Sequence, residues 1–366
     1  MEKTKLFYRT IRYFLFKIDP ESVHHFVSYF IKIKGFLFLF FKPKRSSQVL
    51  DIDLCNVSLF NPIAMAAGFD KNGDMVNGLN SFGFGFTEVG TFTKKIQTGN
   101  PRPRLFRVPS QYALFNRMGF NNPGIEKGLE NLRNARFYFA VSIGKSKETP
   151  VEQAVDDYVE ILKTIELSRY KDVKKKIIYI AINISSPNTP GLRLLQNKKY
   201  IKDLIDQCKK TSDLPLFIKF SPDFSSIREF ETTLHSALKA GINGVIVTNT
   251  TSDETITRYV ADDIRKAGGG LSGLPLAQKS ELYLKSALKI CKGKVPVISS
   301  GAVMSKEDIL RRLQWGASVV QVYTGFIYNG PTFVKDCLKY VISKINESGY
   351  PGLIDYQKKF IQRKSK

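Results

Sequence analysis

Short apolar segments rich in β-branched residues recur along the chain, with amphipathic segments between most of them. The apolar segments run for roughly four to eight residues between turn residues, which is typical of buried strands. The segments between them repeat apolar residues every three to four positions, which is typical of helices with one buried face. We therefore predict strands over 63–67, 86–89, 137–143, 177–183, 216–220, 244–248, 295–300 and 318–323, and helices that include 151–167, 199–210, 227–240, 276–291 and 306–315.

This alternation predicts the fold class. About eight strand–helix units in roughly 250 to 300 residues is the pattern of an α/β protein with a (β/α)8 TIM barrel. A doubly wound open sheet is the alternative, and the absence of a GxGxxG motif after the first strand disfavours it. We assign the barrel to residues 46–366, which would form the catalytic domain.

Residues 1–45 predict an N-terminal two-helix amphipathic extension. Ten Lys or Arg and three acidic residues alternate there with apolar residues at helical spacing. Charged residues recur every few positions, which argues against a cleaved signal peptide. Asp19 and Pro20 separate two segments, as an N-cap and a first helical residue. The apolar run 35–41 is far shorter than the roughly 20 residues of a membrane-spanning helix. The pattern favours an anchor that lies in a membrane surface, and the alternative is a helical hairpin packed on the barrel with its basic side in solvent.

Composition adds a strong positive charge. The chain has 366 residues, 43% hydrophobic and 24% charged, as in a globular protein with a sizeable core. An excess of 56 Lys and Arg over 33 Asp and Glu gives a net charge of +23, which predicts attraction to nucleic acid, anionic lipid or acidic small molecules. A general lysine bias is the alternative source of this charge. Four scattered cysteines without a CxxC motif and three dispersed histidines predict neither disulfides nor a metal site, and fit a reducing compartment.

Polar residues gather where the predicted strands end, which in a (β/α)8 barrel is the active-site face. The densest set follows strand 177–183, and prolines at 187 and 190 stiffen that loop. Such a loop of neutral donors and acceptors suits a flat polar ring, although an ordinary Asn/Ser/Pro turn has the same composition. The five amide or hydroxyl side chains of this set are Asn183, Ser185, Ser186, Asn188 and Thr189.

Lysine and glycine add further candidate chemistry. Lys219 lies inside an otherwise apolar strand, so we expect it either to face a ligand in the barrel mouth or to pair with a core carboxylate. The glycine-rich loop 268–273 and the turns after the last two strands match the usual barrel phosphate site, although structural turns use the same residues. No carboxylate pair or histidine accompanies them, which argues against glycoside hydrolysis and metal-assisted hydrolysis. A cofactor must therefore supply the reactivity.

Eight stretches together resemble the dihydroorotate dehydrogenases, specifically the quinone-reducing, membrane-associated class (class 2). They are MAAGFDKNG, EVGTFT, PRPRLFRV, NRMGFNNPG, INISSPNTPGLR, TNTT, GGLSGLPL and VVQVYTGF, which extend from about residue 51 onward. The segment DPESVHHF also resembles the two-helix extension of that class. The resemblance implies an enzyme of pyrimidine biosynthesis that oxidises dihydroorotate to orotate with FMN, and then reduces a membrane quinone, either ubiquinone or menaquinone.

The resemblance also implies roles for individual residues. Ser186 would be the catalytic base, where the cytosolic class has cysteine, and Thr189 and Phe120 would gate its proton relay. The residues that would hold FMN are Ala66, Ala67, Gly68, Lys71, Thr91, Ser142, Asn183, Lys219, Thr248, Ser272, Gly273, Gly301, Ala302, Tyr323 and Thr324. Those that would hold dihydroorotate are Lys71, Asn116, Arg117, Met118, Gly119, Phe120, Asn183, Asn188, Asn249 and Thr250. A quinone tunnel would be lined by His24, Arg107 and Tyr323.

Two positions depart from the family's pattern. Ser142 stands where the family has asparagine, and serine is shorter, so its flavin contact is either lost or bridged by water. Ala302 stands where the family has a second glycine, and alanine requires a backbone φ compatible with its Cβ.

Two other functions would also fit parts of the pattern. A tRNA dihydrouridine synthase, another FMN barrel, would suit the +23 charge, but it predicts an RNA-binding domain and a catalytic cysteine that the sequence does not show. A membrane-surface binding protein would have no need of Lys71, Ser186 and Lys219 at its strand ends. We therefore expect no nucleic-acid partner, no metal, a monomer, and a peripheral position on the cytoplasmic side of a bacterial inner membrane.

Overall fold

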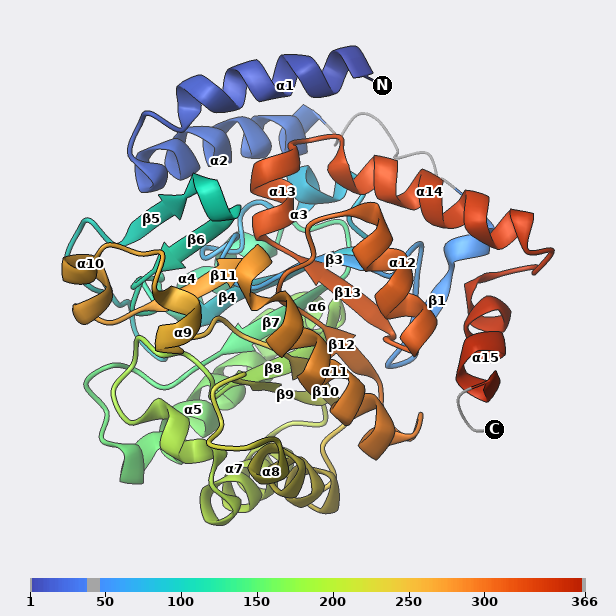
Figure 1. Ribbon diagram of the computed structural model, residues 1–366. Helices are drawn as coiled ribbons and strands as arrows, with labels where there is room; N and C mark the ends of the chain where they lie inside the picture. Colours follow the sequence, from blue (N-terminus) through green and yellow to red (C-terminus); the bar gives the residue numbers. More distant parts are fainter. Residues whose placement is uncertain (1, 38–46, 364–366) are drawn as a thin grey trace.

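The computed structural model describes residues 2–37 and 47–363, and its centre is a closed barrel of eight parallel strands (Figure 1). All eight strands coincide with predicted segments, which confirms the (β/α)8 barrel, and β4 continues three residues further than predicted. The strands follow one another around the barrel in chain order and close through β13 and β3. They are β3 (Ile63–Met65), β4 (Phe86–Phe92), β7 (Phe139–Ile143), β8 (Ile177–Asn183), β9 (Leu216–Phe220), β10 (Gly244–Val247), β12 (Val297–Ser299) and β13 (Val319–Val322).

Helices cover the outside of the barrel, so its strands are buried on both faces. All seven residues of β8 are buried, which explains its continuous apolar sequence. The five predicted helices are all present, and the segment 151–167 begins with a short 3-10 turn before its α-helix. The helices around and beside the barrel are α3 (Val76–Asn80), α4 (Ile125–Leu132), α5 (Ala154–Glu166), α6 (Lys171–Lys174), α7 (Lys198–Thr211), α8 (Ile227–Lys239), α11 (Ala277–Cys291), α12 (Lys306–Trp315), α13 (Thr324–Asn329), α14 (Phe333–Glu347) and α15 (Leu353–Arg363).

A three-stranded antiparallel sheet lies beside the barrel mouth and consists of β5 (Leu105–Val108), β6 (Ala113–Asn116) and β11 (Gly270–Gly273). The expectation of a continuous glycine-rich loop over 268–273 is therefore wrong, because its last four residues form β11. The glycines permit close approach between segments, since a Cβ at Gly270 would lie 2.1 Å from Thr250 Oγ1. The remaining short elements are β1 (Ile52–Leu54), β2 (Val57–Leu59), α9 (Glu254–Thr257) and α10 (Asp262–Lys266).

The predicted N-terminal helices are present as a hairpin of α1 (Glu2–Leu15) and α2 (Pro20–Leu37), which lies across α13, α3 and β5 (Figure 1). Asp19 caps α2 as expected, because its carboxylate accepts the amide of Ser22 at 2.7 Å. The hairpin is joined to the barrel domain by the buried pair of Glu21 and Arg104, at 2.7 Å. Among the described helices, none has the length and apolar character that a membrane crossing requires. The predicted boundary at residue 45 and most of the apolar run 35–41 lie outside the described residues.

Large apolar side chains are exposed on the hairpin. They are Phe7, Ile11, Tyr13 and Phe14 of α1, Ile18 of the turn, and Phe26, Tyr29, Phe30 and Ile33 of α2. The hairpin therefore packs on the barrel, as the alternative prediction stated, and still presents an aromatic surface to its surroundings.

Candidate active site

A polar pocket opens at the carboxyl ends of the barrel strands, where the sequence predicts the active site. The ends of every barrel strand except β7 contribute to it, and the sheet of β5, β6 and β11 contributes from the side. The predicted cofactor and substrate residues that line it are Ala66, Ala67, Gly68, Lys71, Thr91, Asn116, Met118, Gly119, Phe120, Asn183, Asn188, Lys219, Thr248, Asn249, Thr250, Ser272, Gly301, Ala302, Tyr323 and Thr324, together with the predicted base Ser186.

Four residues predicted for the cofactor, the substrate or the proton relay lie outside this lining: Ser142, Gly273, Arg117 and Thr189. Ser142 is buried on β7, and its hydroxyl lies 2.9 Å from that of Thr91, which does line the pocket. Gly273 ends β11, where a Cβ would collide with the backbone of residues 112 and 113. The backbone amide of Arg117 donates to the carbonyl of residue 104, at 2.8 Å. The structure thus places Ser142 behind Thr91 rather than in the pocket.

The predicted base Ser186 lies on residues 184–196, here called the Ser186 loop, which follows β8. Ser186 is 5% exposed, and its Oγ accepts the backbone amide of Asn188 at 3.2 Å. Thr189, three residues further, is buried, and its hydroxyl has no hydrogen-bond partner among the described residues. The ring of Phe120 packs close to Gly144 and borders the same pocket. Of the two predicted relay residues, Phe120 therefore lines the pocket with Ser186, and Thr189 is buried in the Ser186 loop outside the lining.

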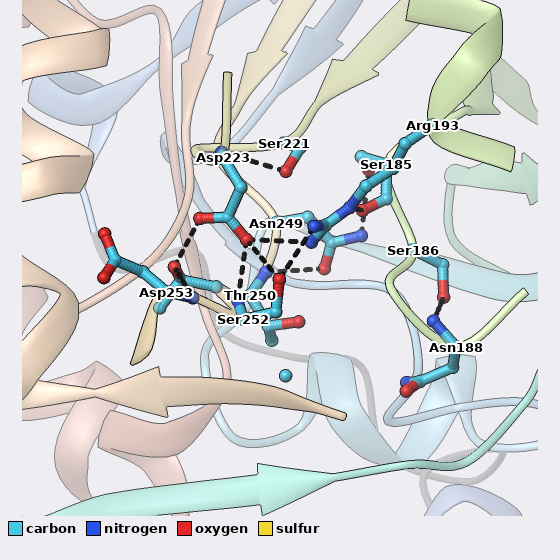
Figure 2. Close-up of polar contacts among 12 residues, drawn as sticks. Ser185, Ser186, Asn188, Arg193, Ser221, Asp223, Asn249, Thr250, Ser252 and Asp253 are labelled. Atoms are coloured by element: carbon cyan, nitrogen blue, oxygen red, sulfur yellow. Dashed lines mark hydrogen bonds and ion pairs between the residues drawn. The ribbon is translucent and has the colours of Figure 1, made fainter. Parts of the chain in front are cut away.

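Four amide side chains from three segments line the pocket together with Ser186, and Figure 2 shows two of them, Asn188 and Asn249. Asn183 donates to Thr91 Oγ1 at 3.0 Å and accepts the hydroxyl of Ser185 at 2.9 Å. Asn249 donates to that same Ser185 hydroxyl at 2.9 Å. Asn188, in the Ser186 loop, donates to Oδ1 of Asn116 at the end of β6, at 3.1 Å. These contacts fix the amides with donors and acceptors facing one space, which suits a planar ligand with several polar groups.

Lys219 meets both expectations from the sequence, because it lines the pocket and also pairs with a core carboxylate. Its Nζ lies 3.2 Å from Oε1 of Glu88, which is fully buried on β4. Glu88 Oε2 accepts hydrogen bonds from Tyr179 at 2.9 Å and from Gln321 at 2.5 Å. Burial, and then the charge of Glu88, raise the pKa of Tyr179 well above its ordinary value, so it remains a donor. Glu88 was not predicted from the sequence. The sequence could have indicated it, because Glu88, like Lys219, is a charged residue inside a largely apolar strand.

Lys71 provides a second cation at the pocket edge, where its Nζ donates to the carbonyl of Gly68. Burial lowers the pKa of Lys71 to about 8, and the charge of Glu21 partly opposes that shift. The neighbouring Asp70 shapes the turn, because its buried carboxylate accepts the backbone amides of Gly73 and Met75 at 2.8 and 2.9 Å. Within the described ranges, no group of three or more His, Cys, Asp or Glu side chains is arranged to hold a metal ion.

The turns after β12 and β13 form the third part of the pocket. Ser272 and Thr324 place their hydroxyl oxygens 2.8 Å apart on its wall. Ala302 has φ +53°, so the position that departs from the family's pattern adopts the left-handed backbone that glycine prefers. Such a conformation costs alanine roughly 1 kcal/mol. Behind the turn lies the fully buried Arg312, which donates to Ser299 Oγ at 2.7 Å and which was not predicted from the sequence.

Of the three predicted tunnel residues, Tyr323 lies at the pocket, and His24 and Arg107 lie at the hairpin. Tyr323 lines the pocket, and Phe69 lies between it and His24, with ring centroids 5.6 Å and 5.0 Å apart. Burial, and then the charge of Lys71, lower the pKa of His24 to about 3, so its ring is neutral. Arg107 contacts the turn of the hairpin, because it donates to the carbonyl of Ile18 at 2.7 Å. No pattern in the sequence indicated the part that Phe69 plays in this row of rings.

Comparisons with known proteins agree with this geometry. The family model of dihydroorotate dehydrogenase matches residues 49–345. A protein named dihydroorotate dehydrogenase (quinone) from a Nitratiruptor species is 40% identical to this chain, over 96% of this chain and 95% of the relative. A protein of the same name from Sulfurimonas denitrificans is 38% identical, over 94% of this chain and 97% of the relative. The crystal structure of the Eimeria tenella DHODH in complex with ferulenol superposes with a TM-score of 0.80 at 31% identity, over 92% of this chain and 94% of that one. The chain therefore belongs to the dihydroorotate dehydrogenase family.

Proposed function

We propose that this protein oxidises dihydroorotate to orotate, with FMN as the first electron acceptor and a membrane quinone, ubiquinone or menaquinone, as the last. The observation that carries the proposal is the position of Ser186, which is buried in a pocket among convergent amides and two lysines. Family membership supports the same reaction, since relatives that span nearly the whole chain carry the name dihydroorotate dehydrogenase (quinone).

The residues present fit an FMN molecule. The pocket is lined by small and polar residues at the ends of the barrel strands, as a site for a polar nucleotide would be. Two polar atoms of its lining residues, Thr248 Oγ1 and Gln321 Oε1, are buried without a partner among the described residues, as groups that await a ligand would be. Lys219 and Asn183 would contact the ring, and Ser272, Thr324 and the turn at 301–302 would hold the phosphate. When bound, FMN supplies a two-electron acceptor for a hydride.

The substrate would lie between the cofactor and the amides. Dihydroorotate carries one carboxylate, which matches the cation of Lys71, and a ring with imide N–H and C=O groups, which match Asn116, Asn188 and Asn249. Thr250 and the segment 117–120 would complete this wall. At neutral pH Lys71 is mostly protonated, because its pKa of about 8 lies above that pH. The bound ring would therefore be oriented by charge at one end and by neutral hydrogen bonds around its edge.

Ser186 would then remove the proton from C5. The proton on C5 would pass to Ser186 Oγ, the hydrogen on C6 would leave with the electron pair of its bond as hydride to the FMN that the pocket would hold, and the electron pair of the C5–H bond would form the C5=C6 double bond of orotate. A serine hydroxyl is a weak base at neutral pH, so the proton needs an onward path. The unpartnered hydroxyl of Thr189 would provide that path, and the ring of Phe120 would shield it from bulk water.

The N-terminal hairpin would bring quinone and membrane to the barrel. Its exposed aromatic residues and basic side chains suit the surface of an anionic bilayer. The neutral His24, Phe69 and Tyr323 form a row of rings from the hairpin to the pocket, along which an apolar quinone would approach. We assign residues 1–45 to this function and 46–366 to catalysis, in a monomer bound peripherally to the cytoplasmic side of a bacterial inner membrane.

The experiment that tests this proposal is orotate formation by the purified protein with a quinone acceptor. The wild type should form orotate, and Ser186→Ala should lose roughly 10²- to 10⁴-fold in kcat, because it lacks the base. Ser186→Cys should retain more activity, since a thiolate can accept the proton. Full activity of Ser186→Ala would exclude Ser186 as the base, and absence of orotate formation by the wild type would exclude the reaction.

A further inference from the structure

The Ser186 loop has few hydrogen bonds of its own, so its position depends on its neighbours. Residues 192–196 of the loop form a 3-10 helix, at whose start the amides of Leu192 and Leu194 donate to the carbonyls of Thr189 and Gly191 at 3.2 and 3.0 Å. In the part before it, Ser186 Oγ accepts the Asn188 amide at 3.2 Å. The two prolines at 187 and 190 have no amide hydrogen to add. A loop that carries a base must be held to within a fraction of an ångström for proton transfer.

A single guanidinium connects this loop with the two loops that follow it in the barrel (Figure 2). Arg193 lies 3.0 Å from Asp223 Oδ2 in the loop after β9, and it donates to Ser252 Oγ at 2.9 Å in residues 248–253, here called the β10 loop. Its Nε also donates to the carbonyl of Ser185 at 3.4 Å. The side chain is 26% exposed, so most of it is removed from water.

Asp223 is the centre of this network. Its carboxylate accepts the amide and the hydroxyl of Ser252 at 2.6 and 2.9 Å, the hydroxyl of Thr251, and the ammonium of Lys279 at 3.0 Å. Burial alone would raise the pKa of Asp223, but these hydrogen bonds and the charges of Arg193 and Lys279 hold it below its ordinary value. The group is therefore an anion at neutral pH, and it holds the β10 loop by two adjacent residues.

These contacts hold two of the segments that line the pocket, the Ser186 loop and the β10 loop. Arg193 holds the carbonyl of Ser185, the residue before the base, and the Ser185 hydroxyl accepts the side chain of Asn249. Asp223 holds the two residues that follow Thr250 in the β10 loop. Neither Arg193 nor Asp223 lines the pocket itself, so both act through other residues.

We propose that Arg193 and Asp223 form a positioning pair, which fixes the Ser186 loop against the β10 loop and thereby sets the rate of proton removal from the substrate. This inference rests on the proposed function. It predicts a specific defect: the substrate-dependent half of the reaction slows, whereas electron transfer from the reduced flavin to quinone does not. A merely structural role would weaken both halves together, because it would act on the fold as a whole.

The test compares Arg193→Gln, Arg193→Lys and Asp223→Asn with the wild-type holoenzyme. Under anaerobic conditions, flavin reduction at saturating dihydroorotate should slow by roughly 10- to 100-fold in Arg193→Gln and Asp223→Asn. Reoxidation of the reduced enzyme by a short-tailed quinone should keep its wild-type rate, and Arg193→Lys should recover part of the loss. The double variant should be no slower than the slower single variant, because the two residues act as one unit. An unchanged reduction rate, or equal losses in both half-reactions, would overturn the proposal.

We expect the variants to fold, because a second contact joins the Ser186 loop to the loop after β9: Gln196 Oε1 accepts the amide of Ser221 at 3.0 Å. The matched control is Arg169→Gln, which breaks the exposed pair of Arg169 and Glu126 at 2.6 Å. If Arg193→Gln fails to retain flavin, the half-reaction comparison is made with Arg193→Lys and Asp223→Asn, and unchanged reduction in both would overturn the proposal.

Hydrogen exchange separates this inference from the proposed function. Peptides that cover residues 184–196 and 248–253 should exchange faster in Arg193→Gln than in the wild type or in Arg169→Gln. That result would support the pairing even if dihydroorotate did not reduce the wild-type flavin, an outcome that would instead exclude the proposed function. Unchanged exchange in both peptides would overturn the positioning role.

Discussion

At the scale of single residues, the pair of Glu88 and Lys219 is the most consequential feature inside the barrel. Both side chains are almost fully buried, so each charge depends on the other. Removing one member of a buried pair leaves the other uncompensated and costs about 3 kcal/mol or more, whereas an exposed pair contributes less than about 1 kcal/mol. We therefore expect Glu88→Gln to lower the free energy of unfolding in urea by about 3 kcal/mol.

The control is Glu130→Gln, which breaks the exposed pair of Lys127 and Glu130. It should change the free energy of unfolding by less than about 1 kcal/mol. The double variant Glu88→Gln with Lys219→Met should recover stability relative to Glu88→Gln alone, because no buried charge then lacks a partner. Equal stability of Glu88→Gln and the wild type would contradict the buried pair.

Lys71 gives a prediction for pH dependence. Its pKa of about 8 means that it is a cation below that pH and neutral above it. If the cation holds the substrate carboxylate, KM for dihydroorotate should stay constant below pH 8 and rise as the pH passes that value. Lys71→Met should raise KM by roughly 10- to 100-fold at neutral pH, as the loss of a hydrogen bond to a charged group predicts, and should remove the rise. A rise of the same size in Lys71→Met would contradict this assignment.

At the scale of elements, the hydrophobic pattern predicted the barrel strands and the five named helices, because burial on both faces leaves a strong signal in the sequence. It did not predict β11, since four residues of which two are glycine carry no strand pattern. That strand exists because β6 offers a partner and because glycine fits against Thr250. Partners distant in the sequence decide such short elements, and no local pattern records them.

The hairpin of α1 and α2 exposes several large apolar side chains. Phe14 is 61% exposed and Phe30 52% exposed. If these rings enter a membrane surface, Phe14→Asp and Phe30→Asp should each weaken co-sedimentation with anionic phospholipid vesicles by roughly 10-fold or more, since burial of such a side chain contributes about 1.5–3 kcal/mol. Flavin reduction by dihydroorotate should be unaffected.

The control for this prediction is Leu282→Asp on α11, where the leucine is 51% exposed on the barrel side of the molecule. It should bind vesicles as the wild type does. Loss of vesicle binding in Leu282→Asp, or full binding in the hairpin variants, would contradict a membrane role for the hairpin.

At the scale of the whole molecule, the chain brings three separately encoded regions to one pocket: the strand ends, the small sheet and, through Phe69, the hairpin. The part of the pocket lining at the barrel strand ends could be predicted, because it follows directly after strands that the hydrophobic pattern reveals. Arg193 and Asp223 could not be assigned from the sequence, because their partnership depends on how consecutive loops pack. Ser142 shows the same limit, since only the structure reveals that Thr91 stands in front of it.

The most direct test of the proposed reaction is anaerobic mixing of the purified wild-type holoenzyme with dihydroorotate while flavin absorbance is followed. We predict rapid bleaching of the flavin, formation of one orotate per flavin, and return of the absorbance when quinone is added. Bound flavin that dihydroorotate does not bleach would keep the barrel and the cofactor but contradict the reaction assigned to this pocket.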